Sequence, residues 1–199
     1  MLPTKHEAEQ LLTWAHDLNP GPWANHSRVA ARVAETIAKK CNLDTHRAYI
    51  SGLLHDIGRY EGVRNLHHVY AGYKLMMDKG YDQIAEICMT HSFPAQIFEE
   101  FFGVNDCTTE ESKLIESFIS GKVYNEYDKL IQLCDSIGNV DGVCLIEVRV
   151  INVIRRYGFT SHTTDKIEAL FNLKTYFDKL CNMNIYDLFH DEIRDVSFR

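Results

Sequence analysis

Apolar residues recur at helical spacing through almost the whole chain, and this pattern limits the possible folds more than any other feature. Ala30, Val33 and Ile37, for example, fall on one face of a helix. The alternation of apolar and polar residues that is typical of a half-buried strand is scarce. We therefore predict an all-α fold, a single helical bundle.

Capping residues and helix breakers divide this pattern into separate helices. Thr4 and Glu7 have the spacing of a capping box. Asn25 and Asp44 are placed to cap the next two helices, and Gly58 is predicted to end the third. We predict helices at about residues 4–18, 25–40, 44–57, 67–79, 82–90, 126–138, 144–157 and 163–181, with a short one ending near residue 120 and another within 184–199.

The length and charge of the chain restrict its organisation and its partners. At 199 residues it can form one self-sufficient domain, which we expect to span residues 1–199. The net charge of −7 disfavours an extended nucleic-acid surface, which requires clustered Lys and Arg. It does not exclude a small phosphate ester, because a bound metal ion can reverse the local field.

Neither a membrane segment nor a disulfide framework is expected. No apolar stretch approaches the roughly 20 residues of a spanning helix, and the first residues lack the basic start and apolar run of a signal peptide. The six cysteines are scattered and form no Cys-x-x-Cys pair. We therefore expect a cytoplasmic protein with reduced, buried thiols.

Four polar residues fall on the inward faces of different predicted helices: His26, His68, His91 and Asp135. Taken alone, each has an ordinary structural explanation as a helix-end residue, a loop-end residue or a partner of a lysine. A carboxylate or an imidazole on a buried face is costly, however, unless it is paired or ligates a metal. Together the four residues suggest one polar centre inside the bundle, as in helical metalloproteins.

The His55-Asp56 pair strengthens this interpretation. Adjacent helix residues point about 100° apart, so both side chains can reach one centre only if the backbone relaxes near the end of the helix. The apolar Leu53-Leu54 that precedes the pair is hard to explain as solvated surface. Gly52, one turn earlier, leaves room for a cofactor beside the imidazole.

At this point the sequence resembles the HD superfamily of metal-dependent phosphohydrolases. The resemblance covers roughly residues 22–140 and rests on His26, then Leu54-His55-Asp56-Ile57-Gly58, then Asp135 in Leu133-Cys134-Asp135-Ser136. The two-metal subset of the family adds the equivalents of His68, in His-Val-Tyr-Ala-Gly, and of His91, in Met-Thr-His-Ser. An N-terminal helix and a C-terminal helical extension then flank this core.

The resemblance implies an enzyme that hydrolyses a phosphate ester of a small metabolite, such as a nucleotide, with one or two divalent transition metals. The first metal is expected to bind His26, His55, Asp56 and Asp135, and the second His68 and His91, with Asp56 bridging the two and central to catalysis. Mixed imidazole and carboxylate ligands suit Fe, Mn, Co, Ni or Zn better than Ca.

Arg59 is the first candidate to bind the substrate phosphate and to stabilise charge during its transfer. It follows His55 by four residues, and its planar fork can hold two phosphate oxygens. The alternative, a solvated cation at a helix end, fits the sequence equally well. Arg64, Lys122 and Arg149 are weaker candidates, because nothing in the sequence places them near the centre.

Two other functions fit the same ligand set: a di-iron oxygenase of the HD type, and a non-catalytic nucleotide-binding module. The signatures of P-loop proteins, zincin proteases and serine hydrolases are absent from the sequence, which contains no Gly-x-x-x-x-Gly-Lys-Ser/Thr, His-Glu-x-x-His or Gly-x-Ser-x-Gly. A metal-dependent hydrolase is therefore the function that the sequence favours.

Overall fold

The structure, a computed structural model, describes residues 1–197, and these are all-α apart from one short hairpin, as predicted. The α-helices are α1 (Lys5–Leu18), α2 (Trp23–Lys40), α3 (Thr45–Leu54), α4 (His67–Asp78), α5 (Asp82–Thr90), α6 (Thr109–Gly121), α7 (Glu126–Ile137), α8 (Ile146–Tyr157), α9 (Thr163–Cys181) and α10 (His190–Ser197). The short 3-10 helices are η1 (Ile57–Glu61), η2 (Phe98–Glu100) and η3 (Ile185–Phe189). The hairpin, which was not predicted, pairs β1 (Gly138–Asn139) with β2 (Gly142–Val143) in antiparallel fashion.

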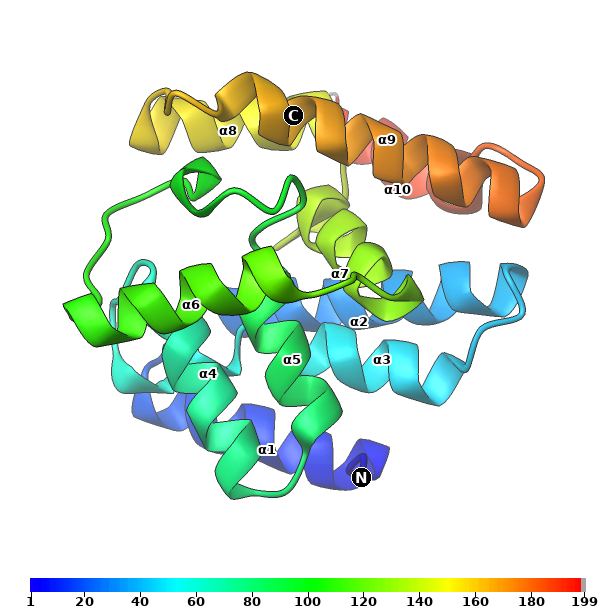
Figure 1. Cartoon of the computed structure of the whole chain (residues 1–199). Coiled ribbons are helices and arrows are strands. Elements are labelled where there is room, and N and C mark those ends of the chain that lie inside the picture. Colours follow the sequence, from blue (N-terminus) through cyan, green and yellow to red (C-terminus); the bar gives the residue numbers. More distant parts are fainter. Residues whose placement is uncertain (198–199) are drawn as a thin grey trace.

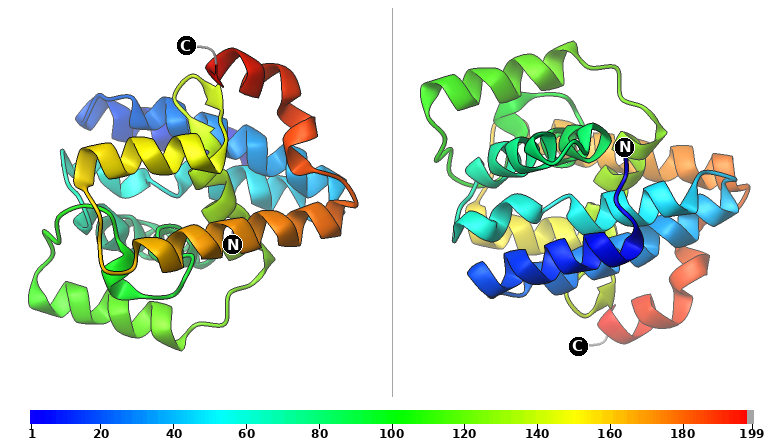
Figure 2. Two further views of the ribbon diagram at one scale, coloured as in Figure 1. Left: turned by 90° about the horizontal axis from the view of Figure 1, so that it is seen from above. Right: turned by 90° about the horizontal axis from the view of Figure 1, so that it is seen from below.

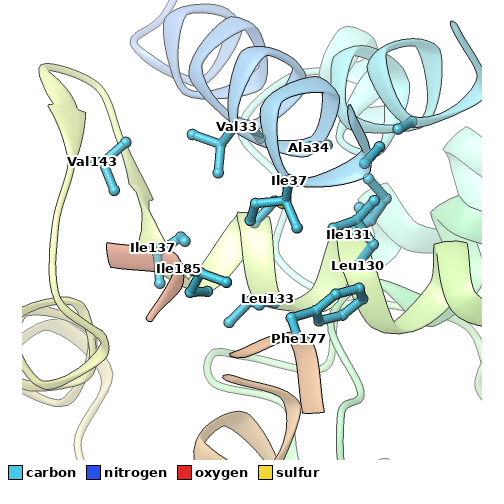
Figure 3. Packing of buried hydrophobic residues seen from close by; sticks show 14 of the residues in the cluster. Val33, Ala34, Ile37, Leu130, Ile131, Leu133, Ile137, Val143, Phe177 and Ile185 are labelled. Carbon is cyan, nitrogen blue, oxygen red and sulfur yellow. The ribbon is translucent and has the colours of Figure 1, made fainter. Parts of the chain in front are cut away.

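The helices are stacked around a central pair (Figure 1). Helices α2 and α3 pack against each other, with α1 below them and α7 across their other side. Helices α8 and α9 lie over α7 as a further layer, and α10 lies to one side of them next to the hairpin, as the view from above shows (Figure 2). Ile37 of α2, Leu133 of α7 and Phe177 of α9 meet in one hydrophobic cluster that joins this layer to the rest (Figure 3). None of the helices within residues 1–197 combines the length and the apolar composition needed to span a bilayer.

Two of the predicted helix caps are confirmed. The Thr4 hydroxyl accepts the Glu7 N–H at 3.2 Å, and the Glu7 carboxylate accepts the Thr4 N–H at 2.7 Å, which completes the capping box of α1. The Asp44 carboxylate accepts the Arg47 N–H at 3.0 Å at the start of α3. These caps form because the side-chain acceptors satisfy N–H groups that lack a partner within the helix.

Helix α2 begins earlier than predicted. Its first residue is Trp23, and the preceding Pro22 already has a helical backbone. The fixed φ of proline suits a helix start, so no side-chain cap is needed there. Asn25 therefore lies inside the first turn, and its assignment as the cap is wrong. His26 follows it on the buried side of the helix.

Helix α3 ends sooner than predicted, and this ending matters for the site. It stops at Leu54, and His55 and Asp56 connect it to η1, which contains Gly58. Gly58 does not terminate the α-helix. A Cβ at this position would overlap the backbone of His68 in α4, so glycine is required for the close approach of η1 to α4. That approach brings the His55-Asp56 pair next to His68.

Gly52 serves helix packing and not a cofactor. A Cβ at this position would lie only 2.7–2.9 Å from backbone atoms of Ala30 and Ala31 in α2. The absence of a side chain therefore lets α2 and α3 pack with their backbones in near contact. The expectation that Gly52 leaves room beside the His55 imidazole is wrong, because α2 fills that space.

The expectation of six reduced cysteines is also wrong. Cys41, just past the end of α2, and Cys181, the last residue of α9, form a disulfide bond across 140 residues of sequence. Cys88, Cys134 and Cys144 are free and buried, and Cys107 is free and half-buried. The pair is formed by the docking of α9 against α2, a long-range contact that cysteine spacing alone does not indicate.

Candidate metal centre

Five helices bring the six predicted ligands to one place in the bundle. They come from α2 (His26), the end of α3 (His55 and Asp56), the start of α4 (His68), the residue after α5 (His91) and α7 (Asp135). Five of the six are at most 5% exposed, whereas the side chain of Asp135 is 25% exposed. The centre is therefore buried on the side of α2 to α5 and open on the side of α7.

These residues form two groups that share Asp56. Ligand atoms of His26, His55 and Asp56 lie within 4.8 Å of one another, and so do those of Asp56, His68 and His91. Asp56 Oδ1 lies 3.1 Å from His68 Nε2 and 3.5 Å from His91 Nε2. Its other oxygen, Oδ2, lies 3.9 Å from His55 Nε2. One carboxylate thus faces both groups with different oxygens.

Asp135 approaches the first group from α7. Its Oδ1 lies 2.9 Å from His26 Nε2 and 3.8 Å from His55 Nε2. The packing of α7 against α2 produces this contact between residues far apart in the sequence. The relaxed backbone at Asp56, with φ of −100° and ψ of 12°, lets adjacent side chains converge there, as the sequence predicted.

Backbone carbonyls fix the orientation of three imidazoles. The Nδ1 of His55 donates to the carbonyl three residues earlier at 2.7 Å, and that of His91 does the same at 2.9 Å. His68 Nδ1 makes the equivalent hydrogen bond to the Asn65 carbonyl. Because a carbonyl only accepts, each Nδ1 carries a proton, and each Nε2 is left facing the centre. Histidine metal ligands are usually held in this way.

An unpaired buried atom indicates that the centre fits a metal ion. Among the described residues, the buried His55 Nε2 has no hydrogen-bond partner. Leaving such an acceptor unpaired is costly, so a ligand at this position would stabilise the fold. The surrounding donors are imidazole nitrogens and carboxylate oxygens, which suit divalent transition metals. The buried His and Asp residues could therefore hold metal ions.

The protonation states of the centre also suit metal binding. Burial lowers the pKa of His55 to about 4 and lowers the pKa of His68 as well, so both imidazoles are neutral at pH 7. Burial alone would raise the pKa of Asp56, but the Arg59 guanidinium and the adjacent imidazoles hold it well below its usual range. The pKa of Asp135 is lowered too, because nearby histidines outweigh the effect of burial. Neutral imidazoles and ionised carboxylates are the forms that bind metals.

Arg59 lies beside the centre. Its Nε donates to Asp56 Oδ2 at 2.7 Å, and its side chain is 31% exposed. The guanidinium is therefore paired with a buried carboxylate and is not a freely solvated cation at a helix end. Its remaining N–H groups adjoin a cleft that it helps to line.

This cleft leads from the centre to the surface. Asp56, His68, His91 and Asp135 line its inner part, and residues of α8 and α9 line the opposite side. The space within it, including its open mouth, is about 920 Å³. Polar groups at its inner end and the apolar side chains of Val150, Val153 and Leu170 on its opposite side suit a small ligand.

Of the three weaker candidates for phosphate binding, the structure places two at the cleft and one away from it. Arg64 and Arg149 line the cleft, whereas Lys122 does not and instead pairs with Glu86 at 2.7 Å. Sequence reasoning missed Arg156 and Lys166, which also line the cleft. The spacing of Arg149 and Arg156, two turns apart on one predicted helix, is the signal that could have identified the first of these.

A third group of possible ligands lies outside the cleft lining: His67, Cys107 and Glu111. His67 Nε2 is 2.8 Å from a carboxylate oxygen of Glu61, and its Nδ1 is 3.3 Å from one of Glu111. Glu111 also completes the capping box of α6. These contacts explain the group as a structural network at the starts of α4 and α6.

Comparison with known families assigns the segment that carries this centre. Residues 23–139 match the HD domain, whose family consists mostly of metal-dependent hydrolases. No curated protein and no solved structure matched the chain. The matched segment contains all six candidate ligands and ends before α8. Because the match covers more than half of the chain, the protein belongs to the HD domain family.

Proposed function

We propose that this protein is a metal-dependent phosphohydrolase that cleaves a phosphate ester of a small metabolite, with a nucleotide as a candidate substrate. The observation that carries this proposal is the position of Asp56 between two histidine groups, with Oδ1 toward His68 and His91 and Oδ2 toward His55. A carboxylate placed in this way is suited to bridge two metal ions. The first ion would be held by His26, His55, Asp56 and Asp135, and the second by Asp56, His68 and His91.

Bound there, Fe, Mn, Co, Ni or Zn would lower the pKa of a water molecule to about 7 and neutralise charge on a phosphoryl group. The protein's own residues supply positioning. The Nδ1 hydrogen bonds of His55, His68 and His91 hold three imidazoles in one orientation before any ligand arrives. Such preorganisation avoids a reorganisation cost during the reaction.

Arg59 is the proposed phosphate-binding residue. Only its Nε is engaged by Asp56, at 2.7 Å, so its terminal N–H groups remain available at the cleft. A guanidinium can donate two parallel hydrogen bonds to a phosphate, and its charge would stabilise negative charge that develops on the phosphoryl oxygens. Its contact with Asp56 fixes it at the edge of the centre.

The test combines metal analysis with an activity screen. Purified protein is analysed for bound metals, loaded with each candidate ion and assayed with nucleotides and other phosphate esters. Asp56→Asn should lose metal and at least about 100-fold of the turnover, because the shared ligand is weakened while its size is kept. Asp17→Asn, an exposed change in α1, is the matched control and should retain both.

Three results would overturn the proposal. Full metal content and full turnover in Asp56→Asn would show that the proposed metal centre is wrong, provided that circular dichroism shows the same helix content in both variants. Dioxygen consumption by iron-loaded protein, without phosphate release under any metal, would favour the oxygenase. Tight nucleotide binding without turnover under every metal would favour the non-catalytic module.

A further inference from the structure

We propose that α8 and α9 form a second anion-binding subsite, so that the substrate carries at least two phosphate groups. This inference rests on the proposed function, because it concerns the far end of the same substrate. It assigns a role to residues outside the segment that matches the HD domain, which ends at residue 139. Candidate substrates are therefore nucleoside diphosphates or triphosphates and other compounds with two phosphates.

The cleft concentrates positive charge in a protein that is acidic as a whole. Its lining contains five cationic residues and only two acidic ones, whereas the chain has 21 Lys and Arg against 28 Asp and Glu. The two acidic residues are Asp56 and Asp135, whose charge a bound metal ion would offset. A single phosphate group carries at most two negative charges, so the cleft offers more positive charge than one phosphate requires.

Four of the five cations fall into two sets that differ in their partners. Arg59 lies 2.7 Å from Asp56, and Arg149 lies 3.8 Å from Asp135, so both adjoin the carboxylates of the candidate metal centre. Arg156 and Lys166 make hydrogen bonds to backbone carbonyls, and neither forms an ion pair with a carboxylate of residues 1–193, whose side chains the structure describes. Their charges therefore remain available to an anion.

Lys166 is held in place beside the centre. Its Nζ donates to the carbonyl of Ser92 at 2.7 Å and approaches that of Glu100 at 3.5 Å. Ser92 follows the candidate ligand His91, so this ammonium lies close to the second histidine group. An ammonium has three N–H donors, and two carbonyls leave one for a further acceptor in the cleft.

Arg156 extends the positive wall toward solvent. It lies two turns beyond Arg149 on α8, and the residues between them that line the cleft, Val150 and Val153, show that one face of the helix is turned toward the site. The Arg156 guanidinium lies 5.7 Å from the centre of the Tyr157 ring, which also lines the cleft. Arg149 and Arg156 thus place two cations about two turns apart along one wall of the cleft, where a second phosphate could be bound beside the first.

Arg155→Gln and Arg156→Gln form a matched pair for the test. Both arginines are exposed, and they are adjacent in α8, but only Arg156 lines the cleft. The probes are methylphosphonate, with one anionic group, and methylenediphosphonate, with two groups that resist hydrolysis. Calorimetric titration of the manganese-loaded protein, with the same manganese concentration in both solutions, gives the ratio of the two dissociation constants.

The protein without substitutions should bind methylenediphosphonate at least about tenfold more tightly than methylphosphonate. In Arg156→Gln this ratio should fall by about fivefold or more, and in Arg155→Gln it should not change. Lys166→Gln should lower the ratio as well, in protein whose circular dichroism is unaltered. Metal chelation by the diphosphonate affects every variant equally, so the comparison between the two arginine variants isolates the subsite.

Equal ratios in Arg155→Gln and Arg156→Gln would overturn the second subsite. This result is distinguishable from failure of the proposed function. If the ratio is lower in Arg156→Gln but the protein hydrolyses no phosphate ester, the second subsite is supported and the proposed hydrolase activity is ruled out. If the protein hydrolyses a phosphate ester and the two variants give identical ratios, the hydrolase activity is supported and only the second subsite is ruled out.

Discussion

The two walls of the cleft hold their functional groups in different ways. On the wall formed by α2 to α5, the histidines and Asp56 are buried, and backbone carbonyls orient three of the imidazoles. On the wall formed by α8 and α9, the functional groups are cations at the ends of long side chains. Arg156 is exposed there, and the side chain of Arg149 is 23% exposed.

We propose that the first wall carries out the reaction and that the second wall selects the substrate. Displacing a reacting group by about 1 Å can cost a factor of about 100 in rate, so catalytic groups must be held rigidly. Cations that bind a phosphate tolerate more variation, because attraction between charges depends weakly on angle. The rigid wall lies within the HD domain match, whereas α8 and α9 lie outside it. Family membership therefore suggests metal-dependent hydrolysis, and we propose that the second wall selects the substrate.

The sharpest test of the rigid wall compares two adjacent histidines. His68→Ala should lose one of two bound metals and about 1,000-fold of the turnover, because His68 Nε2 is aimed at Asp56 from 3.1 Å. His67→Ala should keep both properties, because His67 contacts Glu61 and Glu111 instead. Metal analysis and steady-state kinetics measure the two effects. Equal losses in the two variants would show that the rigid wall is not specific to the proposed ligands.

The disulfide bond tests how firmly the second wall is attached to the first. Cys41→Ser should lower the free energy of unfolding by about 3 kcal/mol, because the Cys41–Cys181 bond closes a long loop in the unfolded chain. Cys107→Ser, at a free half-buried thiol, should change it by no more than about 0.5 kcal/mol. Denaturant titration under non-reducing conditions measures both. Unchanged stability in Cys41→Ser would mean that packing alone attaches α9.

Glu100 lies where the two walls of the cleft meet, because Lys166 of α9 approaches its backbone carbonyl. Burial raises the pKa of the Glu100 carboxyl from 4.5 to about 7, so the folded state binds this proton more tightly than the unfolded state. The free energy of unfolding should therefore fall by about 3 kcal/mol as the pH rises from about 4.5 to above 7.

Glu100→Gln should remove most of this decline, because the amide keeps the carbonyl acceptor for the N–H groups of Ala95 and Ile97 and cannot ionise. Glu99→Gln, at the exposed neighbour, should leave the decline in place. Denaturant titrations at pH 5 and pH 8 compare the variants. The same pH dependence in all of them would exclude Glu100 as the source.

The smallest predicted effect concerns cations within the first wall. Arg59→Gln should reduce turnover about tenfold, because the guanidinium that adjoins Asp56 is lost from the edge of the centre. Arg64→Gln should reduce it by about threefold or less, since Arg64 is exposed at the cleft and solvent screens its charge. Kinetics at saturating substrate distinguish the two. A larger effect at Arg64 would place the phosphate farther from the centre than we propose.

Helix positions were the most predictable feature of this protein, and the six candidate ligands proposed from the sequence remain a prediction although they lie close together. The capping box at Thr4 and the cap at Asp44 were correctly inferred, because they depend on contacts three residues apart. The end of α3 was not, because the approach of η1 to α4 decides it. The role of Gly52 was likewise misread: its neighbour is α2, which the local sequence does not indicate.

The cationic wall and the disulfide bond show the limit of the same reasoning. Arg156 and Lys166 stand in no recognisable motif, and the six cysteines have no diagnostic spacing. Their partners are set by the docking of α8 and α9 over α7 and against α2. Apart from the two-turn spacing of Arg149 and Arg156 on one helix, a residue whose role depends on such docking has no local signal that distinguishes it from any other arginine, lysine or cysteine on a helix.

The sequence by itself determined the all-α architecture and the order of histidines and aspartates that marks the family, because helical periodicity and adjacent motifs are properties of neighbouring residues. The family resemblance led us to expect Asp56 between two metal groups and Asp135 near His26. Only the tertiary structure decided which oxygen of Asp56 faces which histidines, and that α8 and α9 complete the cleft. These contacts arise from many apolar faces packing together at once. Their geometry is therefore a property of the whole fold and of no single segment.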